Sequence, residues 1–370
     1  MRRLTTLFVV ITLVGVAGCT RGVELRDVLS LSPDGHRVLR EKANQLELYD
    51  LDTAQAAWRA SVARPPGWQG AVVEWSGNGA FFVLGEEEYP SSDAGLYSIW
   101  ERDTGRRVSP VYAIKGQWVT AEGGLAVSDD GRWFACNRAK KAVHLYDTRQ
   151  EKPVLEIPVA DLSYLPLAFA PDSQRFTLAR ELFELRGGSW QSAAAFPDSR
   201  SNAWVGGRLA LVTKSAVQIW EHGKITQQVA TRGPVELAAG EHLLAIIEAI
   251  DLSKAKYQDH LERLTLYDAD RGATRFARED LGSDLQIVFR GERLFVRAFR
   301  DVFDTYVLEL DTTTGKTLGQ AGFGEFGSGV RGSPGSYVSF FPIVLPQARY
   351  FERRSATDPR RGRFQKLTLE

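Results

Sequence analysis

The feature that most constrains this chain is a short unit that returns along almost its whole length. In the first copy, residues 29–35 alternate apolar and polar side chains and end in Ser-Pro-Asp-Gly. Further apolar segments follow at 36–40 and 46–53. Alternation with a period of two is typical of β-strands, and Asp-Gly suits the backbone angles of a tight turn between strands. Each copy therefore predicts strands joined by tight turns.

Seven copies of this unit can be aligned at the first turn. They recur about every 43 residues, the length of a four-stranded propeller blade, and the spacing varies in the loops rather than in the strand segments. The turns lie near positions 35, 79, 131, 173, 207, 241 and 292.

The units resemble WD40-type and related bacterial, PD40-like propeller repeats. The Ser-Pro-Asp-Gly turn at 32–35 and third strands such as Leu-Tyr-Asp at 145–147 carry this resemblance. It covers residues 23–370 and implies an all-β chain, a β-propeller of four-stranded blades. It does not point to one family within that class.

The number of blades depends on the C-terminal segment. After the seventh unit, three more strand-like segments follow at 341–345, 349–352 and 364–369. Val23-Glu24-Leu25 could supply the missing fourth strand and close the ring, because pairing the two ends leaves no exposed sheet edge. We expect eight blades, closed by pairing of the N-terminal strand with the C-terminal blade; seven blades are the alternative.

The N-terminus has a separate pattern, that of an export signal. Arg2 and Arg3 give a positive start, and residues 4–17 are uncharged and largely apolar. As a helix this stretch would be about 21 Å long, short of the roughly 30 Å hydrocarbon core of a bilayer. Residues 1–18 therefore fit a cleaved signal peptide, with an uncleaved signal anchor as the alternative.

The signal ends in Val16-Ala17-Gly18-Cys19, which resembles the lipobox of bacterial lipoproteins. That resemblance implies cleavage before Cys19, lipid (palmitate) attachment to this cysteine and a lipidated leader over 19–22. The membrane would then be a partner of the chain through several acyl chains, enough for stable anchoring. Thr20, where an aspartate would favour the inner membrane, favours the periplasmic face of the outer membrane in a Gram-negative cell envelope.

Composition and motifs give no support to several classes of function. The formal net charge is +0, so we expect no nucleic-acid partner. The five histidines show no metal-ligand spacing, and we predict no metal site. Without a G-x-S-x-G elbow, a P-loop or a dinucleotide motif, the sequence predicts no cofactor and no catalytic residues.

Aspartates recur at the turns and after the third strands. Their side chains can accept hydrogen bonds from nearby backbone amides, so we predict a structural role rather than a catalytic or calcium-binding one. Cys136 is expected to be a lone buried thiol. Five tryptophans fall at strand positions, where core packing is expected rather than a sugar-stacking platform: Trp75, Trp100, Trp133, Trp204 and Trp220.

Three long hairpins are candidate partner-contact loops, because loops on rigid scaffolds often carry function. One begins with an acidic run, one spans 253–260, and one is basic. The candidate residues are Glu86, Glu87, Glu88, Tyr89, Arg353, Arg354, Arg360, Arg361 and Arg363.

Together these patterns favour a lipid-anchored envelope propeller that is a non-catalytic protein-binding or scaffold module with an envelope protein as partner. The alternative is an envelope hydrolase of the propeller lactonase or glycosidase type. That alternative requires several acidic or histidine side chains to converge at the central channel.

Overall fold

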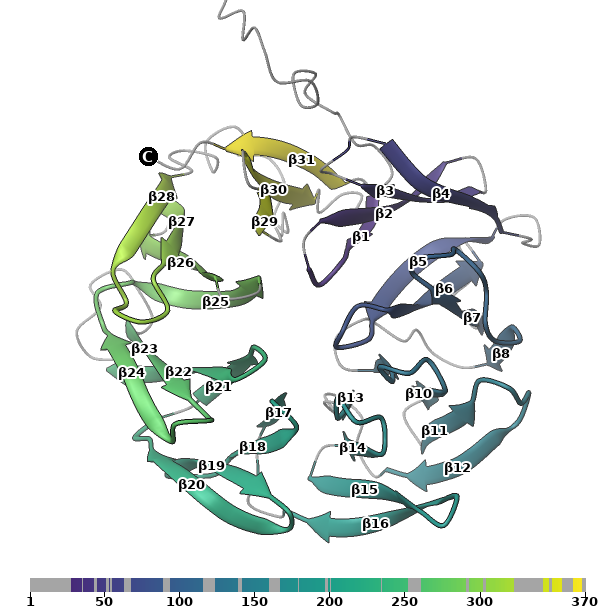
Figure 1. Cartoon of the computed structure of the whole chain (residues 1–370), viewed down its shortest axis with the longest axis horizontal. Coiled ribbons are helices and arrows are strands. Elements are labelled where there is room, and N and C mark those ends of the chain that lie inside the picture. Colours follow the sequence, from purple (N-terminus) through teal and green to yellow (C-terminus); the bar gives the residue numbers. More distant parts are fainter. Residues whose placement is uncertain are drawn as a thin grey trace, which may run out of the picture.

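In the computed structural model, β-sheets follow one another around a ring (Figure 1). Within the described part of the chain every regular element is a strand, which confirms the all-β prediction. No helix there is long and apolar enough to cross a membrane. The structure describes residues 28–34, 36–42, 45–50, 53, 55–62, 68–88, 94–115, 124–138, 142–159, 167–178, 180–196, 199, 201–233, 235–251, 261–290, 293–301, 304–322, 342–345, 348–354 and 362–367.

Each of the seven predicted units forms four antiparallel strands in chain order, and we number these blades one to seven. The first strand lies nearest the centre of the ring and the fourth at the outside (Figure 1). The first strands are β1 (Val28–Leu31), β5 (Trp68–Trp75), β9 (Leu125–Val127), β13 (Leu167–Phe169), β17 (Ser201–Val205), β21 (Val235–Ala239) and β25 (Ser283–Arg290). The second strands are β2 (Arg37–Lys42), β6 (Phe81–Glu88), β10 (Trp133–Arg138), β14 (Arg175–Leu178), β18 (Arg208–Val212), β22 (Leu243–Asp251) and β26 (Arg293–Asp301).

The outer half of each blade is equally regular. The third strands are β3 (Gln45–Asp50), β7 (Ala94–Glu101), β11 (Ala142–Asp147), β15 (Glu181–Arg186), β19 (Ala216–Glu221), β23 (Leu261–Asp268) and β27 (Asp304–Leu310). The fourth strands are β4 (Gln55–Ser61), β8 (Tyr112–Lys115), β12 (Pro153–Pro158), β16 (Ser189–Ala195), β20 (Lys224–Ala230), β24 (Ala273–Arg278) and β28 (Thr317–Gly322).

Three more strands follow blade seven: β29 (Pro342–Leu345), β30 (Ala348–Arg354) and β31 (Gly362–Leu367). Gly362 of β31 pairs with Val28 of β1, so these strands and blade one form a single seven-stranded sheet. The C-terminal strands therefore lie between β28 and the N-terminal blade (Figure 1). The predicted closing strand, 23–25, lies outside the described residues.

The turn between the first and second strands has the geometry that its aspartate predicts. In blade three, Asp130 Oδ1 accepts a hydrogen bond from the backbone N–H of Arg132 at 3.0 Å. Gly131 adopts φ +67°, which glycine tolerates far better than other residues. Equivalent backbone bonds go to Asp34 and Asp172. The structural role predicted for these aspartates is confirmed.

The aspartates after the third strands stabilise the next turn in the same way. Asp147 is 2% exposed and accepts hydrogen bonds from the Arg149 side chain at 2.6 and 2.9 Å. These bonds, with help from Arg132, hold the pKa of Asp147 down to about 2. Backbone amides donate to the corresponding residues Asp50, Asp268 and Asp311.

The hydrophobic core lies between neighbouring blades. The third strand β11 is buried at every position, whereas the outer strand β4 alternates between exposed and half-buried residues. In blade four, the Phe176 ring lies 5.0 Å from the Trp190 ring, and both pack with Trp133 of blade three. The tryptophans predicted to be core residues all join these clusters, and Cys136 is buried and forms no disulfide, as expected.

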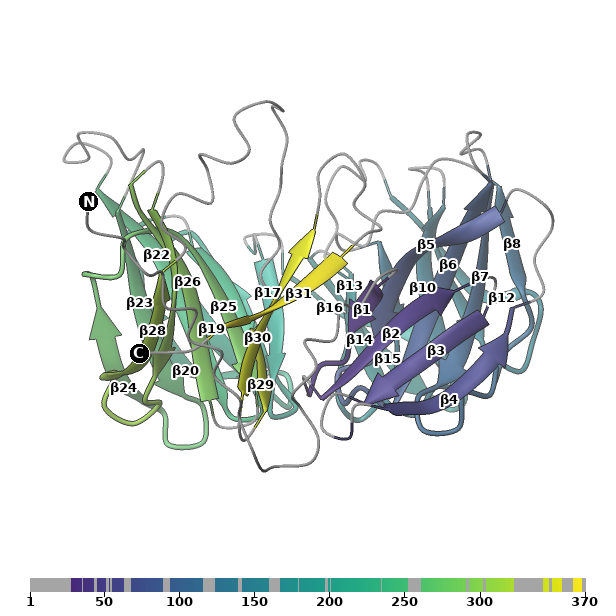
Figure 2. The ribbon, with the colours of Figure 1, turned by 90° about the horizontal axis from the view of Figure 1, so that it is seen from above.

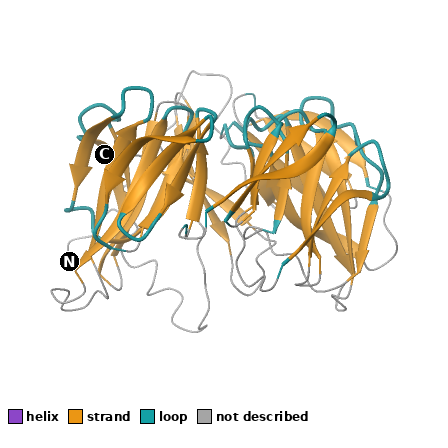
Figure 3. Cartoon of the chain, turned by 90° about the horizontal axis from the view of Figure 1, so that it is seen from below, coloured by secondary structure: helices purple, strands orange, loops and turns teal. Residues whose placement is uncertain are grey.

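The order of strands gives the ring two different faces. One face carries the turns between first and second strands and between third and fourth strands; we call it the turn face. The opposite, hairpin face is where second strands lead to third strands and where each blade leads to the next. Most described turns lie along one edge of the ring in Figure 3, and the side view in Figure 2 shows the strands running between the two faces.

Candidate functional site

Polar contacts on the turn face link each pair of successive blades from one to seven. They include the ion pair between Arg102 and Asp34 at 2.9 Å, which joins blades two and one. The later junctions use Asn78 with Asp129, Asp130 with Ser173, Arg175 with Gly207, Arg208 with Asp270, and Arg278 with Gly315. Every link joins two neighbouring sheets, so the turns on this face are held to one another around the ring. We call this face cross-braced for that reason.

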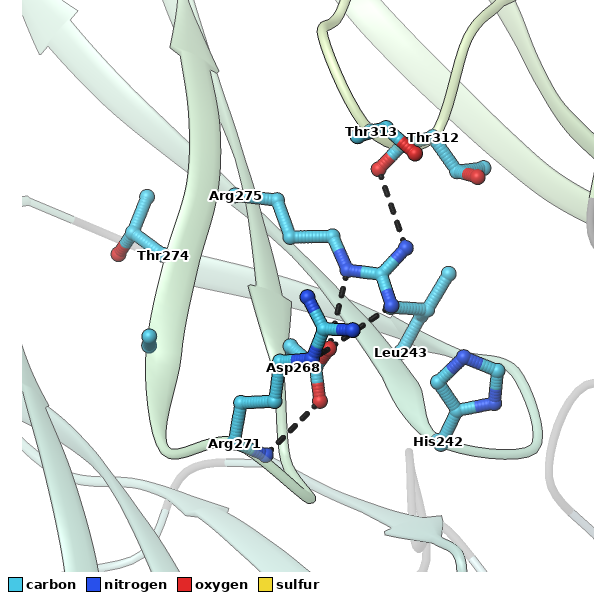
Figure 4. A pocket seen from close by; sticks show the side chains of 9 residues that line it. His242, Leu243, Asp268, Arg271, Thr274, Arg275, Thr312 and Thr313 are labelled. Atoms are coloured by element: carbon cyan, nitrogen blue, oxygen red, sulfur yellow. Dashed lines mark hydrogen bonds and ion pairs between the residues drawn. The ribbon is translucent and has the colours of Figure 1, made fainter.

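A cavity of about 500 Å³ opens on this face between blades six and seven, and we call it the arginine cleft. The turns of blade six supply most of its wall, and the turn between β27 and β28 closes the other side (Figure 4). Its lining residues are His242, Leu243, Asp268, Arg271, Ala273, Thr274, Arg275, Thr312 and Thr313.

Asp268 organises the floor of the arginine cleft. Its side chain is 2% exposed, and Arg275 donates to its Oδ2 from Nε at 3.0 Å and from Nη2 at 2.8 Å. Burial opposes its charge, but the backbone N–H of Arg271 and the Arg275 side chain outweigh that effect and lower the pKa of Asp268. The carboxylate therefore stays ionised and holds Arg275 in place.

Arg271 differs from Arg275 in its surroundings. Its side chain is 78% exposed, and its Nε lies 3.6 Å from Asp268 Oδ2, beyond hydrogen-bond distance. Figure 4 shows the two guanidinium groups side by side, with the His242 ring beside them and the Thr312–Thr313 turn across the cleft. Two arginines against one aspartate leave one positive charge in the cleft when histidine is neutral.

A second cavity, of about 360 Å³, lies on the turn face between blades four and five; we call it the tryptophan cleft. The Arg175 guanidinium lies 5.0 Å from the Trp204 ring centre, within cation–π distance. The Trp220 ring packs edge-on against Phe196 at 5.0 Å, and its buried indole N–H has no hydrogen-bond partner among the residues described. The cleft thus combines aromatic surface with the guanidinium of Arg175.

Few acidic residues lie on the inner strands that the structure describes. They are Glu74 on β5, Glu236 on β21 and Asp284 on β25, which belong to three different blades. Throughout the part of the chain that the structure describes, no group of three or more His, Cys, Asp or Glu side chains could hold a metal ion.

The acidic run, expected to begin a hairpin loop, lies within a strand instead. Glu86, Glu87 and Glu88 belong to β6 instead of starting a loop, and they pair with Gly70, Gln69 and Trp68. Glu86 is only 4% exposed, because the strand continues through the run and turns this side chain inward. Tyr89 lies outside the described residues.

The basic hairpin is described only at its two ends. Arg353 and Arg354 end β30, and Arg363 stands opposite Arg353 at the start of β31. Arg360 and Arg361 lie outside the described residues, as does the whole lipobox, Val16, Ala17, Gly18 and Cys19. The partner role of these residues stays a prediction.

Comparison with solved structures bears on the fold. The chain is similar to the C-terminal WD40 domain of Sif2, with a TM-score of 0.59 and 11% identity over 94% of this chain and 97% of that one. It is also similar to the Cps50 (Swd1) β-propeller domain of Myceliophteria thermophila, with a TM-score of 0.50 and 14% identity over 84% and 100% of the two chains. The fold is a β-propeller.

The same fold occurs in an enzyme. Dihydro-heme d1 dehydrogenase NirN matches with a TM-score of 0.51 and 15% identity, over 92% of this chain and 75% of that one. No protein-family model and no curated protein matches the sequence. At these identities the likeness shows the fold alone, and a propeller fold is compatible with binding and with catalysis.

Neither cleft was predicted from the sequence. Asp268 was recognised as a turn aspartate, but the arginine cleft joins it to Thr312 and Thr313 of the following blade. The available signal was local: Arg271 lies in the turn after the third strand, Arg275 follows in the fourth strand, and three consecutive threonines, 312–314, occupy the corresponding turn of the next unit.

Proposed function

We propose that this protein is a lipid-anchored propeller of the bacterial cell envelope that holds a protein partner on its turn face. The observation that carries the proposal is the pair of clefts on that cross-braced face, lined by arginine and tryptophan side chains. Arginine and tryptophan are over-represented among the residues that dominate binding energy at protein interfaces. A rigid framework also lowers the entropic cost of association.

The lipid anchor gives the ring an orientation. Cys19 precedes Val28 by nine residues, a reach of about 30 Å when fully extended. Strand β1 starts at the hairpin face, so an anchor at Cys19 holds this face toward the bilayer and directs the turn face away from it. The basic hairpin that contains Arg353, Arg354 and Arg363 joins β30 to β31 on the same side, where anionic headgroups would attract it.

We further propose that β29, β30 and β31 form an eighth blade, completed by the segment before β1. The pairing of Gly362 with Val28 supports this arrangement, because it brings the two ends of the chain together. Closure in this way would leave no unpaired edge at the junction.

The anchor is tested by labelling cells with a radioactive fatty acid and comparing the wild type with Cys19→Ala. We expect label in the wild-type protein alone, and membrane association that the variant loses. Label that persists in Cys19→Ala would contradict the lipidation site. A labelled wild type that stays soluble after fractionation would contradict anchoring.

The enzymatic alternative makes a different demand on the molecule. It requires several acidic or histidine side chains to act together at the central channel, whereas the described inner strands carry three acidic residues and no histidine. A propeller scaffold requires only an accessible, complementary surface, which the two clefts provide.

A further inference from the structure

The arginine cleft holds hydrogen-bond donors that the fold does not use. Arg275 is fixed by Asp268 and by the Thr312 carbonyl, which it reaches at 3.4 Å. For the Arg271 guanidinium, by contrast, the described residues provide no hydrogen-bond partner. The same holds for the His242 ring and the hydroxyl groups of Thr312 and Thr313.

These free donors surround one volume. His242 comes from the first turn of blade six, Arg271 from its second turn, and the threonines from the second turn of blade seven (Figure 4). The donors are held by three separate turns, each stabilised by its own backbone hydrogen bonds. Asp268 accepts from the backbone N–H of Asp270 and Arg271, and Asp311 accepts from Thr313 and Thr314.

We propose that the arginine cleft binds the carboxylate group of an acidic peptide segment, supplied by the partner on the turn face. This inference rests on the proposed function and names the chemistry of the partner. Arg271 would donate to the carboxylate oxygens from its planar fork, with Thr313 and His242 completing the contacts. Arg275 would add its charge without leaving Asp268.

The charge of the cleft selects the kind of anion. The net charge of one positive unit matches a carboxylate, which carries one negative charge. A phosphate monoester carries about −1.5 to −2 at neutral pH, and its excess charge would face the ionised Asp268. The cleft therefore favours a carboxylate over a phosphate group.

Binding is tested by fluorescence polarisation on the full-length, detergent-extracted protein. The probe is a labelled, C-terminally amidated Gly-Asp-Glu-Gly-Asp peptide, and equally amidated Gly-Asn-Gln-Gly-Asn is its counterpart without carboxylates. We expect the acidic peptide to bind and its counterpart not to bind. Acetate should displace the probe at a lower concentration than inorganic phosphate does.

Arg271→Gln is the decisive variant, and Arg106→Gln is its matched control. Arg106 also lies in a turn between third and fourth strands, is 70% exposed, and contacts a single carboxylate, Glu101, at 3.5 Å. We expect Arg271→Gln to weaken peptide binding at least about fivefold, the effect of losing a charge-assisted hydrogen bond, and Arg106→Gln to leave it unchanged. Equal losses in the two variants would mean general electrostatic attraction and would overturn the site.

A measurement on the wild-type protein tests the site even if Arg271→Gln fails to fold. The chain has five histidines, so their imidazole NMR signals can be assigned and followed during titration with the peptide. We expect the His242 signals to shift and those of His36, on blade one, to stay unchanged. A wild type that binds no acidic peptide at millimolar concentration, or one that prefers phosphate, would overturn the carboxylate assignment.

The outcome is separable from that of the proposed function. If Arg271→Gln still captures an envelope protein on the turn face in cells, the scaffold role stands and the carboxylate site fails. If the peptide binds in vitro but no partner is captured in cells, the site stands and the proposed function fails.

Discussion

Two kinds of surroundings shift the pKa of acidic side chains in this propeller in opposite directions. Asp147 and Asp268 sit at turns, where backbone amides and arginines favour their charged form. The sequence predicts these positions because Tyr-Asp marks the turns. Glu74 has the opposite surroundings: it lies on the inner strand β5, where the described residues offer its carboxylate no hydrogen bond or ion pair, and burial raises its pKa to about 8.

Replacing Glu74 by glutamine is expected to make stability less dependent on pH. The folded-state pKa of Glu74 lies above its unfolded value near 4, so the folded state binds the proton more tightly. Its stabilising contribution is complete below about pH 4 and is lost as the pH rises toward 8. Relative to wild type, Glu74→Gln should therefore gain at least about 1 kcal/mol in unfolding free energy between pH 5 and pH 8.5.

Urea denaturation at the two pH values measures this gain. Glu236→Gln, on the exposed glutamate of inner strand β21, is the matched control. A wild type and a Glu74→Gln variant that change in parallel from pH 5 to pH 8.5 would contradict a buried, proton-binding Glu74.

Single blades follow closely from the sequence, because each is defined by local signals. Alternating apolar residues mark the strands, and Asp-Gly or an equivalent marks the first turn, as at Asp130 and Gly131. The acidic run at Glu86 shows the limit of such signals. The charge of the run suggested a loop, whereas pairing with β5 and β7 continues the strand to Glu88. The neighbouring strands, rather than the acidic residues themselves, determine where this strand ends.

Alanine substitutions at two glycines distinguish the stability cost of backbone strain from the cost of a clash between blades. Gly131 and Gly187 both adopt left-handed φ, +67° and +58°, so alanine strains the backbone similarly at either position. An added Cβ at Gly131 would lie 2.5 Å from the Phe81 ring of blade two, whereas at Gly187 it would meet open space. Gly187→Ala should cost about 1 kcal/mol of unfolding free energy, and Gly131→Ala about 2–3 kcal/mol.

Thermal and urea unfolding of both variants check this difference. The larger loss at Gly131 would show that the first turn of blade three is fitted against blade two. Similar losses in the two variants would mean that the blades are not packed as closely as described.

In the whole molecule, the alternating direction of the strands places different turns, with different side chains, on the two faces of the ring. The first turns of the blades share one face, because the four strands of each blade alternate in direction, and Asp34, Asp130 and Asp172 lie in these turns. The clefts were not predictable from the sequence, because Arg271 and Thr313 meet only through the packing of two blades, which no single repeat encodes. In the proposed function, the hairpin face lies toward the membrane and the turn face binds the partner.

The most direct test of this division is photo-cross-linking in the native envelope. A photoreactive residue is placed at Thr274, exposed on the turn face beside the arginine cleft, or at Ser215, exposed in the β18–β19 hairpin on the opposite face. We expect a discrete protein adduct from position 274, lost in Arg271→Gln, and none from position 215. A protein adduct from position 215 with none from position 274 would contradict the proposed division between the two faces.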